Sequence, residues 1–217
     1  MSWQAGLYIL AVFLPLAAFL IQFLGVKLLG RRNAYVATGA IGLAFVLSLI
    51  GFVDYFLIEA EGVFAHHGAS HATATEAHAD ASHEGEHAPA ATEAHHGPVA
   101  WTASMNWVTL GEGVGVAGPF TPGLTIPLEI YIDNLGVIMF LMVTFIATLI
   151  HLYSMGYMSD DPRYPRFFTF LSLFCFSMLG LVASANLFMV FMCWELVGVC
   201  SYLLIGFWYE DKKNCDA

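Results

Sequence analysis

Five long apolar runs determine what this 217-residue chain can fold into. They cover approximately residues 5–29, 34–58, 131–154, 167–184 and 187–209. A helix of about 20 residues rises about 30 Å, which matches the hydrocarbon thickness of a bilayer. The sequence therefore predicts an all-α, polytopic membrane protein with about five transmembrane helices.

The composition agrees with a membrane protein and excludes several other classes. Hydrophobic residues make up 59% of the chain and charged residues 11%, whereas soluble domains carry about 25% charged residues. The net charge of -10 is local, because many of the acidic residues lie between Glu59 and Glu93, so no nucleic-acid footprint exists. The four cysteines show no CxxC spacing, which argues against a disulfide framework or a metal knuckle.

The basic residues predict the orientation of the chain. All 7 fall on one side of the membrane if the five runs alternate: Lys27, Arg31, Arg32, Arg163, Arg166, Lys212 and Lys213. By the positive-inside rule that side is the cytoplasm. The N-terminus is then expected outside and the C-terminus inside.

The chain divides into four parts, one of which is a long connection. We expect transmembrane helices 1 and 2 in 1–58, an external loop in 59–130, transmembrane helices 3 to 5 in 131–209, and a cytoplasmic loop in 210–217. Within the external loop, residues 60–100 are rich in Ala, His, Glu and Thr, which predicts disorder. Residues 101–130 contain Trp101, Trp107 and many glycines and prolines, which predict short strands or turns on the outer surface.

The external loop also contains eight of the chain's nine histidines. They are His66, His67, His71, His78, His83, His87, His95 and His96. Neutral imidazoles bind Zn, Cu or Ni well, but a structural site needs about four ligands at a fixed geometry, and these spacings are irregular. We therefore expect no specific metal site; saturable zinc binding by a 60–100 peptide would contradict this.

Glu195 is the ionisable residue near the middle of the fifth run. A carboxylate near the bilayer midplane costs at least a few kcal/mol, so it is a functional candidate by default. At 100° per residue, Gly198, Tyr202, Gly206 and Tyr209 fall on the same side of the helix and are candidate channel-lining residues. The functional interpretation is a proton-carrying carboxylate on a face toward protein or water. The alternative is a buried Glu that only hydrogen-bonds a neighbouring helix.

Other polar residues near the runs allow two interpretations each. His151, near the inner end of the third run, is a candidate proton relay because its charge changes near neutral pH. An interfacial or backbone-bonded His is equally compatible with its position. Asp54 and Asp133 are expected at the outer interface, and Asp160 and Asp161 in a solvated loop. Phosphate loops, nucleophile–base pairs and cofactor motifs are absent from the sequence, so we expect no redox centre, cofactor or metal in this chain.

Two segments resemble a known family. Residues 194–209 read WELVGVCSYLLIGFWY, and residues 151–158 read HLYSMGYM, followed by Arg166-Phe167-Phe168. Both are similar to the L-type, antiporter-like membrane subunit of respiratory complex I. This is NADH dehydrogenase subunit 5 in mitochondria and the F chain in plastids. The similarity is strong over residues 130–217 and weak over 1–58.

The resemblance implies a function for the chain. Members of this family pump protons or other cations across an energy-coupling membrane, here expected to be a bacterial inner membrane. The residue that matches Glu195 is a proton-channel carboxylate that faces a Lys on a later helix. The implied partners are other membrane subunits of complex I, especially neighbouring antiporter-like subunits. NADH, FMN, iron–sulfur clusters and quinone are expected in other subunits.

The sequence also departs from the family pattern. An Asp often precedes the fifth span, whereas here the segment is Ser184-Ala185-Asn186, so we assign no proton role to that turn. The family's chains continue for several hundred residues beyond the position of Ala217, so an N-terminal fragment is expected. Three alternatives remain: a multi-subunit Na⁺/H⁺ antiporter subunit, the membrane subunit of an inorganic-carbon uptake complex, and a non-pumping assembly scaffold.

Overall fold

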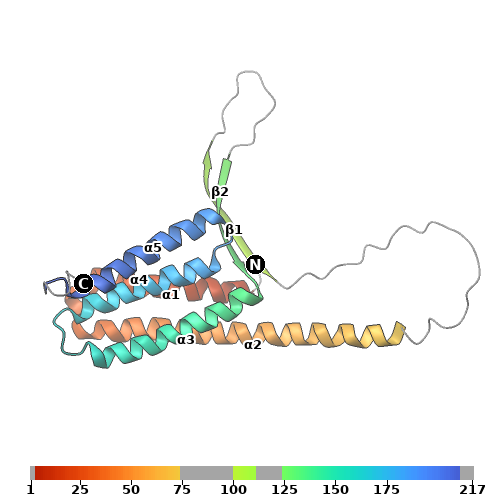
Figure 1. Ribbon diagram of the computed structural model, residues 1–217, viewed down its shortest axis with the longest axis horizontal. Coiled ribbons are helices and arrows are strands. Elements are labelled where there is room, and N and C mark those ends of the chain that lie inside the picture. Colours follow the sequence, from red (N-terminus) through yellow and green to blue (C-terminus); the bar gives the residue numbers. More distant parts are fainter. Residues whose placement is uncertain (1–2, 74–99, 111–123, 211–217) are drawn as a thin grey trace, which may run out of the picture.

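The computed structural model describes residues 3–73, 100–110 and 124–210 (Figure 1). Its main elements are α1 (Trp3–Leu29), α2 (Asn33–Thr73), β1 (Trp101–Leu110), β2 (Leu124–Ile132), α3 (Asn134–Tyr157), α4 (Tyr164–Ala183) and α5 (Leu187–Ile205). Two short 3-10 helices follow α1 and α5: η1 (Gly30–Arg32) and η2 (Gly206–Trp208).

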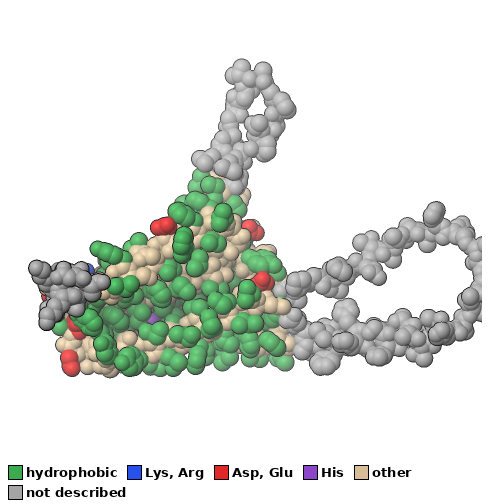
Figure 2. Space-filling view, viewed as in Figure 1, with side chains coloured by type: hydrophobic (Ala, Val, Ile, Leu, Met, Phe, Trp, Pro, Cys, Tyr) green, Lys and Arg blue, Asp and Glu red, His purple; other side chains and the backbone are tan. Residues whose placement is uncertain are grey.

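Across the described ranges, five helices are long and apolar enough to cross a membrane. Their spans are Trp3–Val26, Gly30–Leu57, Asn134–Tyr157, Tyr164–Ala183 and Leu187–Trp208. These spans confirm the predicted all-α architecture of a multi-pass membrane protein. Apolar side chains cover most of the surface that Figure 2 shows over the helices, as a lipid-facing protein requires.

Helices α1 to α4 lie side by side as a bundle (Figure 1). Tyr8 of α1 lies in the centre of the bundle. Its ring centroid is 5.1 Å from that of Phe140 in α3 and 5.7 Å from that of Trp101 at the start of β1. Gly51 of α2 lets the Tyr8 ring approach the backbone, since a Cβ at position 51 would lie 2.6 Å from the Tyr8 hydroxyl oxygen. Small residues permit this kind of close helix contact within membranes.

The α1–α2 connection packs on the α3–α4 loop at one end of the bundle. Gly30 takes a positive φ of 48°, which glycine adopts readily, and lets the chain reverse between α1 and α2. Arg31 Nη2 donates to the Ser159 carbonyl at 2.6 Å, and Asn33 Nδ2 donates to the Pro165 carbonyl at 2.7 Å. We call this the basic end, because it carries the described basic residues Arg31, Arg32, Arg163 and Arg166. Their common location agrees with the predicted topology.

A two-stranded antiparallel hairpin of β1 and β2 lies at the opposite end, which we call the hairpin end (Figure 1). The pairing runs from Trp101 opposite Ile132 to Leu110 opposite Leu124. Its register shifts between Asn106 and Val108, next to Pro127, which has no N–H to donate to the ladder. The hairpin confirms the strands predicted within residues 101–130 and adds a small β element to the helical fold.

Helix α2 extends well beyond the predicted boundary at residue 58. It ends at Thr73, so the prediction of disorder for 60–100 is wrong over residues 60–73. Ala-rich sequence has high helix propensity, and extending an existing helix needs no new nucleus. The remaining residues of that segment, 74–99, lie outside the described ranges.

Candidate functional site

The start of α5 is fixed to the hairpin by Ser184, Ala185 and Asn186. Ser184 forms an isolated β-bridge with Ile130, and the Ala185 N–H donates to the Glu129 carbonyl at 3.0 Å. Asn186 has two roles: its Oδ1 accepts from the Met189 N–H at 2.8 Å as the N-cap, and its Nδ2 donates to the Pro127 carbonyl at 2.8 Å. Asn is among the preferred N-cap residues, so this role was visible in the sequence but was missed.

Contacts between small residues determine which side of α5 packs against α4. A Cβ at Gly180 of α4 would lie 3.0 Å from Cys193 Sγ, so the two helices approach closely there. Cys200, two turns further along α5, is fully buried. Since successive residues turn by 100°, Glu195 lies about 200° around the helix from Cys193 and projects from the opposite side.

The outer face of α5 carries the predicted stripe. Glu195, Gly198, Tyr202 and Gly206 are all exposed, and Tyr202 has 75% of its surface accessible. Large apolar residues extend the same face along the helix: Leu187, Phe191, Trp194, Val199 and Ile205. Among the residues that the structure describes, none hydrogen-bonds or pairs with the Glu195 carboxylate. The stripe therefore faces away from the bundle.

Tyr209 does not continue the stripe as a helix. Helix α5 ends at Ile205, with Gly206 as its C-cap, and η2 redirects the chain. The Tyr209 ring centroid lies 5.6 Å from Arg163 Cζ and 5.9 Å from Arg166 Cζ. The structure thus places Tyr209 at the basic end, beside two guanidinium groups.

His151 lies inside the bundle. It is 1% exposed, its Nδ1 is 2.8 Å from the Ala147 carbonyl oxygen, and its ring centroid is 6.1 Å from that of Phe168 in α4. Within the described residues, Nε2 has no hydrogen-bond partner. The backbone contact agrees with the backbone-bonded interpretation, and the structure does not bring His151 to the exposed face that carries Glu195.

The acidic residues near the ends of the spans have structural contacts. Asp133 caps α3 by accepting from the Gly136 N–H at 2.7 Å, and Asp54 accepts from Gln4 Nε2 at 3.1 Å. Asp161 accepts from the Arg163 N–H at 2.7 Å and from Trp208 Nε1 at 2.8 Å. Asp161 therefore connects the α3–α4 loop to η2, a role that sequence reasoning missed.

The described part of the chain contains no cluster of three or more His, Cys, Asp or Glu residues that could hold a metal ion. The side chains of the eight external histidines lie outside the described residues, so the prediction about them is unaffected.

Two family profiles match the chain. One, described as NADH-ubiquinone oxidoreductase (complex I), chain 5 N-terminus, matches residues 120–168. The other, described as NADH:quinone oxidoreductase/Mrp antiporter, transmembrane, matches residues 184–217 and so includes Glu195 and the stripe.

Curated relatives agree with these profiles. Subunit L of the NADH-quinone oxidoreductase of Rickettsia conorii is 34% identical over 206 residues, which are 94% of this chain and 24% of that protein. Chain 5 of the NAD(P)H-quinone oxidoreductase of Synechocystis sp. is 57% identical over 86 residues, which are 40% of this chain and 13% of that protein. The chloroplastic subunit 5 of Chara vulgaris is 56% identical over 94 residues, 43% of this chain and 14% of that protein.

The chain thus spans a quarter or less of the length of these relatives. The matches cover both segments that carry the sequence resemblance and, for the Rickettsia protein, nearly the whole chain. They show that the chain resembles the L-type, or chain 5, antiporter-like membrane subunit of NADH:quinone oxidoreductases.

Proposed function

We propose that this chain is part of a proton-translocating membrane subunit of an NADH:quinone oxidoreductase in a bacterial inner membrane. The named relatives and the two profiles support this assignment. The proposal places the sites for NADH, FMN, iron–sulfur clusters and quinone in other subunits. In this chain, the proposed proton-carrying residue is Glu195.

The exposed position of Glu195 is the observation that carries the proposal. Its helix is the least enclosed of the five spans. Of the most apolar stretch of this helix 6% is buried, against 28–50% for the other four spans. A carboxylate that faced acyl chains at this depth would be costly. We infer that protein or water covers this face in the assembly, and Gly198 and Gly206 leave room for either.

Such a carboxylate exchanges protons in response to its surroundings. In a medium of low dielectric constant, the neutral acid is favoured when no cation is near. A cationic side chain that approaches the covered face favours the carboxylate and release of the proton. Other membrane subunits, especially neighbouring antiporter-like ones, are the proposed source of that charge or of its movement.

A substitution at Glu195 tests this role in the whole enzyme. Glu195→Gln keeps the shape of the side chain but holds no exchangeable acid proton. We expect membrane vesicles with this variant to oxidise NADH while pumping fewer protons per NADH oxidised, and Glu195→Asp to retain part of the pumping. Glu129→Gln, on β2 of the hairpin, is the matched carboxylate control. Unchanged pumping in Glu195→Gln would refute the proposal.

His151 is a secondary proposal as a proton relay. Its unpartnered Nε2 inside the bundle supports it, because a buried polar atom requires a water or another partner. His151→Phe is expected to lower pumping but less than Glu195→Gln. The same vesicle measurement tests it, and equal pumping in His151→Phe and the unmodified enzyme would exclude a relay role.

A cation/proton antiporter is the second candidate, because one matching profile is described for both enzyme types. The two functions differ in their driving force. Vesicles that acidify with NADH but do not respond to an imposed Na⁺ gradient indicate the oxidoreductase. A proton flux driven by Na⁺ without NADH indicates the antiporter.

A further inference from the structure

A second feature is a pocket at the basic end, which shares Tyr202 and Gly206 with the stripe on α5 but does not include Glu195. It has a volume of about 480 Å³ and lies between the first turns of α4 and the last turn of α5 with η2. Its lining includes Arg166, Phe170, Tyr202, Leu203, Phe207 and Trp208. Figure 1 shows the start of α4 and the end of α5 at the same end of the molecule.

The pocket contains a cation with a distinctive environment. The Arg166 guanidinium is exposed, with its Cζ 5.3 Å from the Phe170 ring centroid and 5.9 Å from that of Tyr209. These aromatic faces hold the guanidinium by cation–π contact, which does not use its N–H groups. Within the described residues, no carboxylate pairs with Arg166.

The neighbouring arginine differs in this respect. Arg163 Nη1 lies 3.3 Å from Glu210 Oε1, and Arg163 Nε lies 4.0 Å from Asp161 Oδ1. The local acidic groups Glu210 and Asp161 are therefore engaged by Arg163. Arg163 is partly buried, and its Nη1 is shielded from solvent, whereas Arg166 is exposed. Of this pair, Arg166 is therefore the guanidinium that an external anion can reach.

The position of the pocket places it at the membrane–water boundary. Its residues come from the first turns of the span Tyr164–Ala183 and the last turns of the span Leu187–Trp208. Trp208 and Tyr202 in its lining are residue types that concentrate at this depth. The apolar side chains Phe170 and Leu203 continue from Arg166 into the spans.

We propose that this pocket binds an anionic phospholipid. The phosphate contacts the Arg166 guanidinium, and the upper part of one acyl chain lies against Phe170 and Leu203. Arginine suits phosphate because its planar fork donates two parallel hydrogen bonds. A soluble anion would leave the apolar wall without a partner, whereas a phospholipid matches both the charge and the wall. Basic pockets between membrane helices bind acidic headgroups elsewhere.

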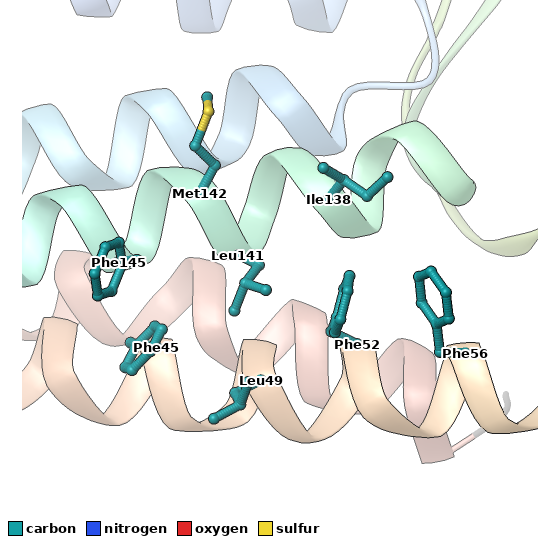
Figure 3. Close-up of a pocket in the computed structure, with 8 residues that line it drawn as sticks. All are labelled: Phe45, Leu49, Phe52, Phe56, Ile138, Leu141, Met142 and Phe145. Carbon is teal, nitrogen blue, oxygen red and sulfur yellow. The ribbon is translucent and has the colours of Figure 1, made fainter.

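The groove between α2 and α3 provides an internal contrast (Figure 3). It has a similar volume of about 500 Å³, and eight apolar residues line it: Phe45, Leu49, Phe52, Phe56, Ile138, Leu141, Met142 and Phe145. Without a charged lining residue, this groove offers nothing that distinguishes one headgroup from another. Of the two sites, only the pocket that contains Arg166 should therefore select anionic lipid.

Native mass spectrometry of the full chain tests the proposal. The chain would be extracted in a zwitterionic detergent and supplied with equal amounts of phosphatidylglycerol and phosphatidylcholine. We expect preferential retention of phosphatidylglycerol, weakened about five- to tenfold by Arg166→Gln. Arg166→Lys should lose part of the preference, because it keeps the charge but not the fork. The matched control is Arg32→Gln, an exposed arginine on η1 outside the pocket, which should retain the preference.

Four results would overturn the site. Equal retention by Arg166→Gln and the unmodified chain excludes Arg166, and an equal loss in Arg32→Gln indicates general surface charge. Displacement of phosphatidylglycerol by millimolar inorganic phosphate indicates a soluble-anion site. Equal binding of dihexanoyl and long-chain phosphatidylglycerol removes the role of the apolar wall. These outcomes do not depend on proton pumping, so they test the lipid site independently of the proposed role of Glu195.

Discussion

The α1–α4 bundle and helix α5 are both strongly apolar, yet they use their apolar residues differently. In the bundle, Tyr8 and Phe140 are buried and pack with a 5.1 Å centroid separation. On α5, Phe191 and Trp194 are 54% and 63% exposed. Because lipid is as apolar as these side chains, hydrophobicity alone does not drive helices together in a membrane. The difference shows that packing contacts decide which helices associate.

Polar groups show the same contrast. The bundle encloses polar side chains, and some of their donors find partners there: Gln22 Nε2 donates to the Asn33 carbonyl at 3.1 Å, and Asn33 Nδ2 donates to Thr169 Oγ1 at 3.2 Å. Helix α5 instead presents Glu195 on its outer face. These two donors in the bundle thus contribute to its structure, whereas the carboxylate on α5 is available to something outside it.

Truncating a large side chain should show the greatest difference between the two regions. Phe140→Ala in α3 removes a fully buried ring and is expected to lower the free energy of unfolding by about 3 kcal/mol. Phe191→Ala on the outer face of α5 should cost less than about 0.5 kcal/mol. Steric trapping of the chain in bicelles measures both. Equal costs would contradict the view that the outer face of α5 is unpacked in this chain.

Adding a methyl group provides a smaller test of the same contrast. Gly51→Ala places a Cβ 2.6 Å from the Tyr8 hydroxyl oxygen, so it should destabilise the chain by about 1–3 kcal/mol. Gly198→Ala on α5 meets nothing within 4 Å and should be neutral or slightly stabilising. Gly42→Ala, in the same helix as Gly51, also meets nothing within 4 Å and is the matched control.

The same glycine pair sharpens the comparison in the complete complex. If another helix covers the outer face of α5 there, Gly198→Ala should reduce the yield of assembled complex while leaving the isolated chain unaffected. An assembled yield equal to that of the unmodified protein would mean that the face is not closely covered at Gly198.

The smallest expected effect concerns the contact that joins the end of α5 to the α3–α4 loop. Burial acts to raise the pKa of Asp161, but hydrogen bonds from Trp208 and the Arg163 N–H, with the charge of Arg163, lower it overall. A lowered pKa in the folded state means that this carboxylate stabilises the fold above its unfolded pKa of about 3.9. That contribution, about 1 kcal/mol or less for an ion pair near the surface, is lost as the pH falls through the lower folded value.

Fluorine NMR of 5-fluorotryptophan protein measures this contact, with Trp208→Phe to assign the resonance. The Trp208 signal should stay constant from pH 7 to 5 and move only below about pH 3.9. Asp161→Asn should abolish the pH dependence. A shift centred between pH 5 and 7 would show that another group controls the contact.

The spans could be predicted from the sequence because the length of an apolar run that crosses a bilayer depends on the bilayer thickness. The location of the described arginines at one end also followed from the alternation of the spans, and the side of the membrane that this end faces stays a prediction. The side of α5 that carries Glu195 also followed from helical periodicity. Periodicity does not predict which side of α5 packs on α4. That choice depends on local fit, such as Cys193 against Gly180, which only the three-dimensional arrangement shows.

The errors have physical causes too. The prediction for residues 60–73 relied on their polar composition, but a helix that has already formed in the membrane can continue into such sequence. The projection of the stripe to Tyr209 assumed one continuous helix, whereas the chain turns through η2 after Ile205. The sequence places Asn186 only in a turn, because its second partner, Pro127, is 59 residues away in the sequence.

That long-range contact has a consequence for biosynthesis. A membrane protein emerges from the ribosome in order, so β2 is made before the segment that fixes it to α5. The carbonyls of Pro127 and Glu129 receive hydrogen bonds from Asn186 and Ala185 only after these later residues have been synthesised. Until then, loop-closure entropy opposes the contact. The hairpin is therefore expected to lock only after α4 has been inserted, which makes this junction a late checkpoint in the assembly of the chain.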